Sequence, residues 1–171
     1  MKSLSFTVFM ALFFVLTAFG QAEFTMKIEN GFLFFNKTLV DIDPGPDWQG
    51  HYLNKEQNAF DVTIGGDLEV FERFSAGIGL GYMNFEGTNG LSLASDLTYV
   101  ILPSKISPLV HGRLGYHHLW NQYDDGTGTF LAEINLGLQY LLTKQTAIYM
   151  KSGFFIAQEA LLIPFRIGVR F

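Results

Sequence analysis

Two adjacent histidines, His117 and His118, stand in the stretch GYHHLWNQ. A neutral imidazole can act as a general acid or base, or as a metal ligand. The stretch has the pattern of a β-strand, in which neighbouring side chains point to opposite faces. Two histidines placed in this way cannot share one metal ion, so we predict no metal site and no cofactor.

A second group of chemically active residues consists of single charges spaced among Gly, Ser and Thr. Such charges must be paired if they are buried, because an unpaired buried charge costs several kcal/mol. Whether they pair depends on the elements that carry them. The residues are Asp61, Asp67, Glu69, Asp96, Arg113, Glu133, Arg166 and Arg170.

These residues lie in segments of period two, the pattern of β-strands with two different faces. The first segment loses its phase at Asn30 and Gly31, where we predict a bulge. Of the seven breaks between segments, the first, third and fifth carry Gly and Asp, so we expect longer loops at one end of the sheet. The eight predicted strands are residues 24–36, 59–71, 74–85, 91–101, 110–120, 130–141, 147–157 and 161–171.

The apolar face of these strands is predicted to be the outside. The segments are longer than the five or six residues usual in soluble proteins and fit the nine to eleven of a tilted membrane strand. The charged fraction is 16%, below the 25% or so of soluble domains. An open sheet edge is costly in hydrocarbon. We therefore predict an all-β fold, a closed eight-stranded antiparallel up-and-down transmembrane barrel.

Aromatic residues of the apolar face gather toward both ends of the strands, as in the interface belts of membrane barrels. One predicted band holds Phe24, Phe71, Phe74, Tyr99, Tyr140, Phe165 and Phe171, and the other holds Phe60, Tyr82, Tyr116, Trp120 and Phe130.

The first 22 residues are predicted to be a cleavable signal peptide, with residues 23–171 forming the barrel domain. Lys2 precedes an apolar stretch from Phe6 to Phe19, and small residues follow as far as Ala22. Fourteen helical residues span about 21 Å, too short for a hydrocarbon core of about 30 Å. The net charge of −5 and the lack of a basic run argue against a nucleic-acid partner.

An eight-stranded barrel leaves an interior just wide enough for side chains. Folding residues 91–101 onto 110–120 puts Asp96 nearly opposite Arg113 and Thr98 near His111. We further expect Glu133 near His117, and Lys27 and Glu29 beside Arg166 and Arg170. The eight charged residues named above are then predicted to form a salt-bridged network that plugs the lumen.

The signal segment, the eight alternating strands and the terminal Phe171 resemble the small bacterial outer-membrane β-barrels of the OmpX or OmpA transmembrane-domain type. This resemblance implies a monomer in the bacterial cell outer membrane, surrounded by membrane lipid. It also implies that the barrel-assembly machinery recognises the last strand, and the residues carrying that signal would be Phe165, Ile167, Val169 and Phe171.

Three function classes follow from such a barrel. The first is a structural or adhesion-like role, with Trp48 and Tyr52 of the first loop as contacts for an extracellular ligand. The second is a narrow conduit for ions or small hydrophobic molecules. The third is a lipid A-modifying enzyme, but no Ser follows the histidines at the H-x-S spacing of the deacylase motif, so we expect a protein that is not an enzyme.

Overall fold

The computed structural model describes residues 23–39, 57–71, 73–120, 126–143 and 145–171. The predicted signal peptide, residues 1–22, lies outside them. Among the described residues, no helix is long and apolar enough to cross a membrane. The strands are β1 (Glu23–Thr38), β2 (Ala59–Phe71), β3 (Phe74–Phe85), β4 (Thr88–Val100), β5 (Ile106–Trp120), β6 (Thr127–Leu141), β7 (Ala147–Ala157) and β8 (Ala160–Arg170).

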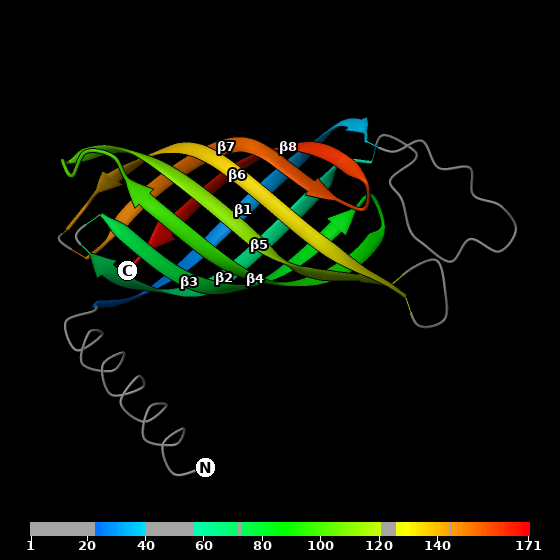
Figure 1. The fold of residues 1–171 in the computed structure, drawn as a ribbon, viewed down its shortest axis with the longest axis horizontal. Helices are drawn as coiled ribbons and strands as arrows, with labels where there is room; N and C mark the ends of the chain where they lie inside the picture. Colours follow the sequence, from blue (N-terminus) through cyan, green and yellow to red (C-terminus); the bar gives the residue numbers. More distant parts are fainter. Residues whose placement is uncertain (1–22, 40–56, 72, 121–125, 144) are drawn as a thin grey trace, which may run out of the picture.

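Each strand pairs antiparallel with the next along the chain, and β1 pairs with β8, so the sheet closes into a barrel (Figure 1). The closing register places Lys27 opposite Arg170 and Phe32 opposite Phe165. The predicted all-β, eight-stranded, antiparallel up-and-down barrel is confirmed.

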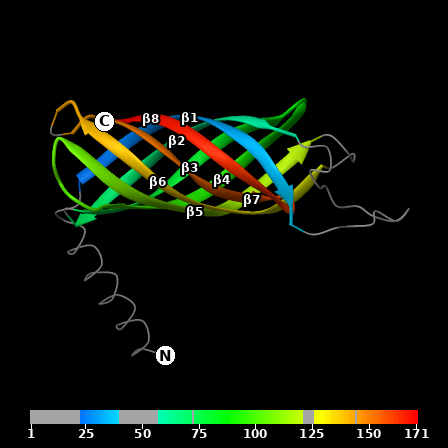
Figure 2. The ribbon, with the colours of Figure 1, turned by 90° about the horizontal axis from the view of Figure 1, so that it is seen from above.

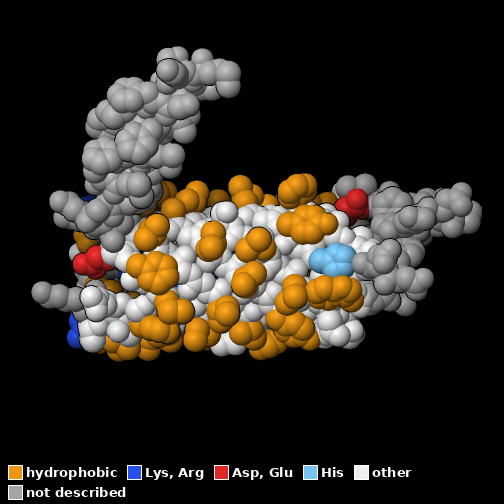
Figure 3. Space-filling view, turned by 90° about the horizontal axis from the view of Figure 1, so that it is seen from below, with side chains coloured by type: hydrophobic (Ala, Val, Ile, Leu, Met, Phe, Trp, Pro, Cys, Tyr) orange, Lys and Arg blue, Asp and Glu red, His pale blue; other side chains and the backbone are white. Residues whose placement is uncertain are grey.

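Side chains alternate between the lumen and the outer wall along every strand. The outward positions are large and apolar: Phe130 is 81% exposed and Leu136 is 69% exposed. On the face drawn in Figure 3, apolar side chains are spread over the wall, and the charged side chains that can be seen lie toward its ends. The polarity is therefore the reverse of that of a soluble barrel.

The two ends of the barrel differ. β1 begins and β8 ends at the same end, which we call the terminal end (Figures 1 and 2). The connections there are residues 72–73, 101–105 and 142–146. The opposite end, here the loop end, carries the long connections 39–58 and 121–126 and two-residue turns at 86–87 and 158–159.

The third connection was predicted to be longer, and this prediction was wrong. β4 already begins at Thr88, so only Glu86 and Gly87 join it to β3. Both turn residues have positive φ, 50° and 105°, as a tight hairpin turn requires. Gly87 also donates its backbone N–H to Asn84 Oδ1 at 3.1 Å.

The bulge predicted at Asn30 and Gly31 was also wrong, because pairing through both residues is regular. Gly31 points into the lumen, where an added Cβ would clash with the Asp61 carboxylate and lie 2.7 Å from Arg166 Nη1. The alternation of inward and outward side chains is therefore unbroken here, and a glycine stands at position 31 because Asp61 and Arg166 need the space. The register shifts instead between Phe35 and Lys37, against β8.

Candidate functional site

The half of the lumen near the loop end is filled mainly by apolar side chains, with the buried polar residues His117 and Gln158 beside them. Phe85 of β3, Leu119 of β5 and Phe155 of β7 are fully buried there. They belong to a layer, here the apolar layer, that closes this half of the barrel. It consists of Leu33, Ala59, Met83, Phe85, Ala94, Leu119, Leu131, Phe155, Ala157, Ala160 and Leu162.

Between the apolar layer and the terminal end lies a cluster of buried charges, the central cluster. It holds Lys27, Glu29, Asp61, Asp67, Asp96, Arg113, Glu133, Lys151 and Arg166, each at most 5% exposed.

One centre of this cluster is Arg166. Its Nε and Nη2 donate to the two oxygens of Glu133 at 2.6 and 2.8 Å. Its Nη1 pairs with Asp61, and lies 3.4 Å from Glu29 Oε1. A bidentate arginine–carboxylate pair of this kind is among the strongest hydrogen-bonded contacts in proteins.

The second centre is Arg113, whose Nε donates to Asp96 Oδ1 at 2.6 Å and whose Nη2 lies 3.2 Å from Glu29 Oε1. Lys27 joins Asp96 at 2.8 Å and Asp67 at 2.7 Å, while Lys151 joins Glu29 Oε2 at 2.7 Å. Glu29 is thus shared by both centres, so the charges form one continuous network and not separate pairs.

The predicted site residues fall at two levels. Asp61, Asp67, Asp96, Arg113, Glu133 and Arg166 lie in the central cluster. Glu69 and Arg170 are separate from it: they pair at 3.2 Å at the terminal end, and their side chains are 31% and 14% exposed.

The expected register holds for Asp96 opposite Arg113 and for Thr98 opposite His111. It fails for Glu133, which lies opposite Arg113, while His117 faces Thr129. The reason is that β6 begins at Thr127, three residues before the predicted start.

Lys151 was absent from the predicted network, although it occupies a lumen position of β7. Its alternation with Tyr149, which is also buried, was the available signal. Tyr149 donates its hydroxyl to Glu29 Oε2 at 3.1 Å. Asn135, likewise unpredicted, donates to Glu133 Oε1 at 2.6 Å.

The central cluster has one more carboxylate than it has cations: five against the four of Lys27, Arg113, Lys151 and Arg166. Among the described residues, Asp61 pairs with Arg166 alone, and its Oδ1 has no hydrogen-bond partner.

The histidines occupy three different environments. His117 is buried in the lumen, with its Nε2 3.1 Å from Gln158 Nε2. His118 points outward, with its ring 4.8 Å from that of Trp120. His111 lies in the lumen, 3.4 Å from Asp96 and 3.2 Å from Asn135. The predicted opposite orientation of His117 and His118 agrees with this placement. His51 lies outside the described residues.

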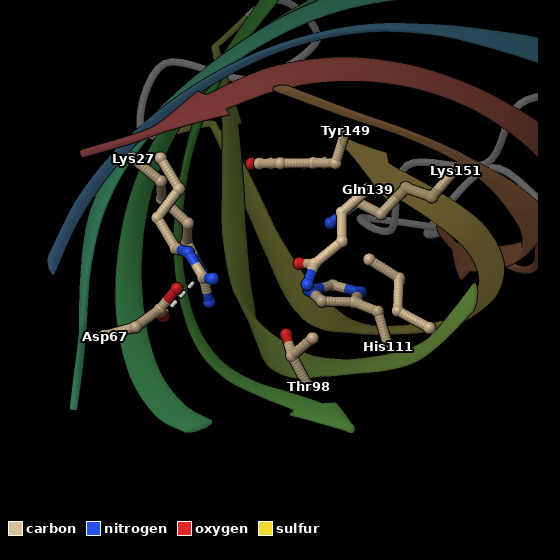
Figure 4. Close-up of a pocket in the computed structure, with 9 residues that line it drawn as sticks. Lys27, Asp67, Thr98, His111, Gln139, Tyr149 and Lys151 are labelled. Carbon is tan, nitrogen blue, oxygen red and sulfur yellow. Dashed lines mark hydrogen bonds and ion pairs between the residues drawn. The ribbon is translucent and has the colours of Figure 1, made fainter. Parts of the chain in front are cut away.

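At the terminal end, two small cavities open among polar side chains. The inner cavity, about 30 Å³, lies beside the central cluster, and Figure 4 shows Lys27, His111 and Gln139 around it. The outer cavity, about 140 Å³, lies at the mouth and is lined by Glu69, Arg73, Ser75 and Gln139. Gln139 and Arg170 line both cavities, so the two adjoin there.

The last strand presents an apolar outer face. Phe165, Ile167, Val169 and Phe171 all point outward, with Phe171 50% exposed. Phe165 lies at the middle of β8, opposite Phe32, so it does not belong to the terminal aromatic band in which it was predicted. Trp48 and Tyr52, the predicted loop contacts, lie outside the described residues.

A closed eight-stranded barrel with an apolar wall and a packed, charged lumen defines the class of small membrane β-barrels. Solved structures with this fold are small eight-stranded outer-membrane barrels. Neisserial surface protein A is similar with a TM-score of 0.60 and 13% identity, over 87% of this chain and 97% of that one.

The N-terminal barrel domain of OprF from Pseudomonas aeruginosa is similar with a TM-score of 0.57 and 14% identity, over 88% and 100% of the two chains. Outer membrane protein H of P. aeruginosa follows at 0.51 and 11%, over 87% and 99%. At these identities the similarity concerns the fold. No protein-family model matches the sequence, and the comparison with curated proteins finds no match.

Proposed function

We propose that this protein is a bacterial outer-membrane barrel that anchors its loop-end connections at the cell surface for structural or adhesive contacts. In this orientation the terminal end faces the periplasm. The observation that carries the proposal is the combination of an apolar wall and a lumen closed by side chains. Such a barrel is suited to hold loops in place and poorly suited to pass solutes.

The closed lumen argues against the conduit. The apolar layer excludes ions, because apolar constrictions dewet. The cavities described above lie on the terminal side of the central cluster and are too small for a continuous path.

The histidines argue against a lipid-modifying enzyme. A general acid–base pair needs its members within hydrogen-bond reach of one substrate. His117 faces the lumen and His118 faces the wall, so they cannot act together.

The fold-level similarity supports the same location, since one of the similar structures is called an outer membrane protein and another a surface protein. The extracellular ligand, the assembly machinery and the monomeric state are parts of the proposal. Trp48 and Tyr52 are our candidates for the ligand contacts, because exposed aromatic side chains are enriched in protein interfaces.

The test uses cells that carry the protein or its Trp48→Ala, Tyr52→Ala variant. Adherence of these cells to wells coated with extracellular-matrix proteins is compared, with Lys105→Ala at the terminal end as matched control. We expect the loop variant to lose most of the adherence and the control to keep it. Equal adherence of all three, or stepwise conductance of the purified protein in planar bilayers, would contradict the proposal.

A further inference from the structure

Two buried polar side chains at the terminal mouth lack a protein partner. Ser75 is 5% exposed and Gln139 is 6% exposed. Ser75 lines the outer cavity and Gln139 lines both cavities. Neither side chain forms a hydrogen bond with the described residues. Their polar atoms face the cavities that they line, so these two side chains are placed to bind a group that is not part of this chain.

The charges around the outer cavity select the kind of group. Among the described residues, three charged ones line it: Glu69, Arg73 and Arg170. Arg170 is paired with Glu69 at 3.2 Å, whereas the Arg73 guanidinium pairs with none of the described residues. The described residues of the lining therefore carry one net positive charge, which favours an anion.

The central cluster limits how far an anion can go. It carries one excess carboxylate, and its cations Lys27 and Lys151 are already held at 2.7 Å by Asp67 and Glu29. The excess negative charge of the central cluster would therefore repel an anion that moved further inward. We expect the anion to bind in the outer cavity, which has a volume of about 140 Å³.

We propose that the terminal mouth is a binding site for a small anion bearing a phosphate or carboxylate group. Arg73 and Arg170 supply the charge, since a guanidinium matches the geometry of both groups. Gln139 and Ser75 supply the buried hydrogen bonds. The anion comes either from free solution or from the headgroup of a lipid at this rim, where Phe71 and Phe74 also line the cavity.

The experiment uses the full barrel refolded in dodecyl maltoside micelles, which contain neither phosphate nor carboxylate. Inorganic phosphate and acetate are titrated in turn, and the backbone amide resonances of Ser75 and Arg170 are followed by NMR. We expect saturable shifts with at least one of the two anions. Arg73→Gln and Gln139→Leu should each weaken that binding at least tenfold.

Lys105→Gln is the matched control, because Lys105 is a basic residue of the same end that lines neither cavity. It should leave the binding unchanged. A gel that separates folded from unfolded barrel checks that each variant folds. Shifts that do not saturate, or that are equal in all variants, would identify an adventitious ion only and would overturn the proposal.

A second arm distinguishes the sources. The barrel is transferred to bicelles containing phosphatidylglycerol, with no added phosphate or acetate. If the same resonances already show the bound shift and Arg73→Gln removes it, the lipid headgroup is a source. If they respond only to added anion, the ligand is a free anion. Because neither arm depends on the loops, failure here is distinct from failure of the proposed surface role.

Discussion

Arg166 on β8 holds Glu133 on β6 by two hydrogen bonds, Nε to Oε1 at 2.6 Å and Nη2 to Oε2 at 2.8 Å. The two strands are not neighbours, since β7 separates them. The contact therefore spans β7 on the inside of the barrel and links the last strand to β6.

We predict that Arg166→Leu lowers the free energy of unfolding by about 3–5 kcal/mol. Among the described residues, it leaves the buried Asp61 without a cation, and leaves Glu133 with Arg113 alone, at 3.8 Å. Arg170→Gln should cost less than about 1 kcal/mol, because its pair with Glu69 is partly exposed. Urea unfolding in lipid vesicles measures both values. Equal losses for the two variants would show that the inner pair contributes no more than the rim pair.

Asp61 and Glu133 should respond differently to neutralisation. Asp61→Asn removes the excess negative charge of the central cluster and keeps the shape of the side chain, so its cost should be small. Glu133→Gln removes the bidentate partner of Arg166 and should cost about 3 kcal/mol or more. The same unfolding assay compares them, and a larger loss for Asp61→Asn would contradict the charge count.

The alternation of side chains was sufficient to predict the strands, the closed barrel and the outward apolar face, because period two determines which residues share a face. Pairings across a break of known length were also predictable, as for Asp96 and Arg113. The predicted partner of Glu133 was wrong because the register between β5 and β6 depends on where β6 begins in the polar segment before Phe130. Thr127 and Gly128 have no apolar alternation to mark that point.

The anion site could not be predicted from the sequence. Ser75 and Gln139 are ordinary lumen residues in the alternation, and their lack of partners depends on how side chains from β3 and β6 fill the mouth. The lumen position of Lys151 could have been predicted from the sequence, because Lys151 has the same phase in the alternation as Tyr149.

The free-energy cost of placing a charged residue on the outer wall should depend on its depth in the membrane. Ile134, at the middle of β6, is 58% exposed. Ile134→Arg should cost about 2–4 kcal/mol, as for arginine at the bilayer midplane, whereas Leu142→Arg, just past the end of β6, should cost about 1 kcal/mol or less. Unfolding in vesicles tests the pair. Similar costs at both positions would contradict a hydrocarbon environment for the wall.

Phe171 should matter more for assembly in cells than for stability. Its backbone pairs with Met26 in both directions, at 2.7 and 2.9 Å, and this pairing survives a change of side chain. We predict that Phe171→Ser refolds in detergent like the parent but accumulates several-fold less folded barrel in the membrane fraction. Leu142→Ser, an apolar loss at the same end, is the matched control. Normal accumulation of Phe171→Ser would remove the proposed assembly signal.

The direction of side chains along one strand tests the central claim, a barrel with its apolar face in lipid. Spin labels are placed singly at residues 133–139 of β6 in vesicles, and their relaxation is measured with oxygen, which concentrates in lipid, and with a water-soluble nickel complex. We predict that oxygen dominates at positions 134, 136 and 138 and that labels at 133, 135 and 139 are shielded from oxygen. Dominance of the nickel complex at 134, 136 and 138 would show a water-facing wall and contradict the account.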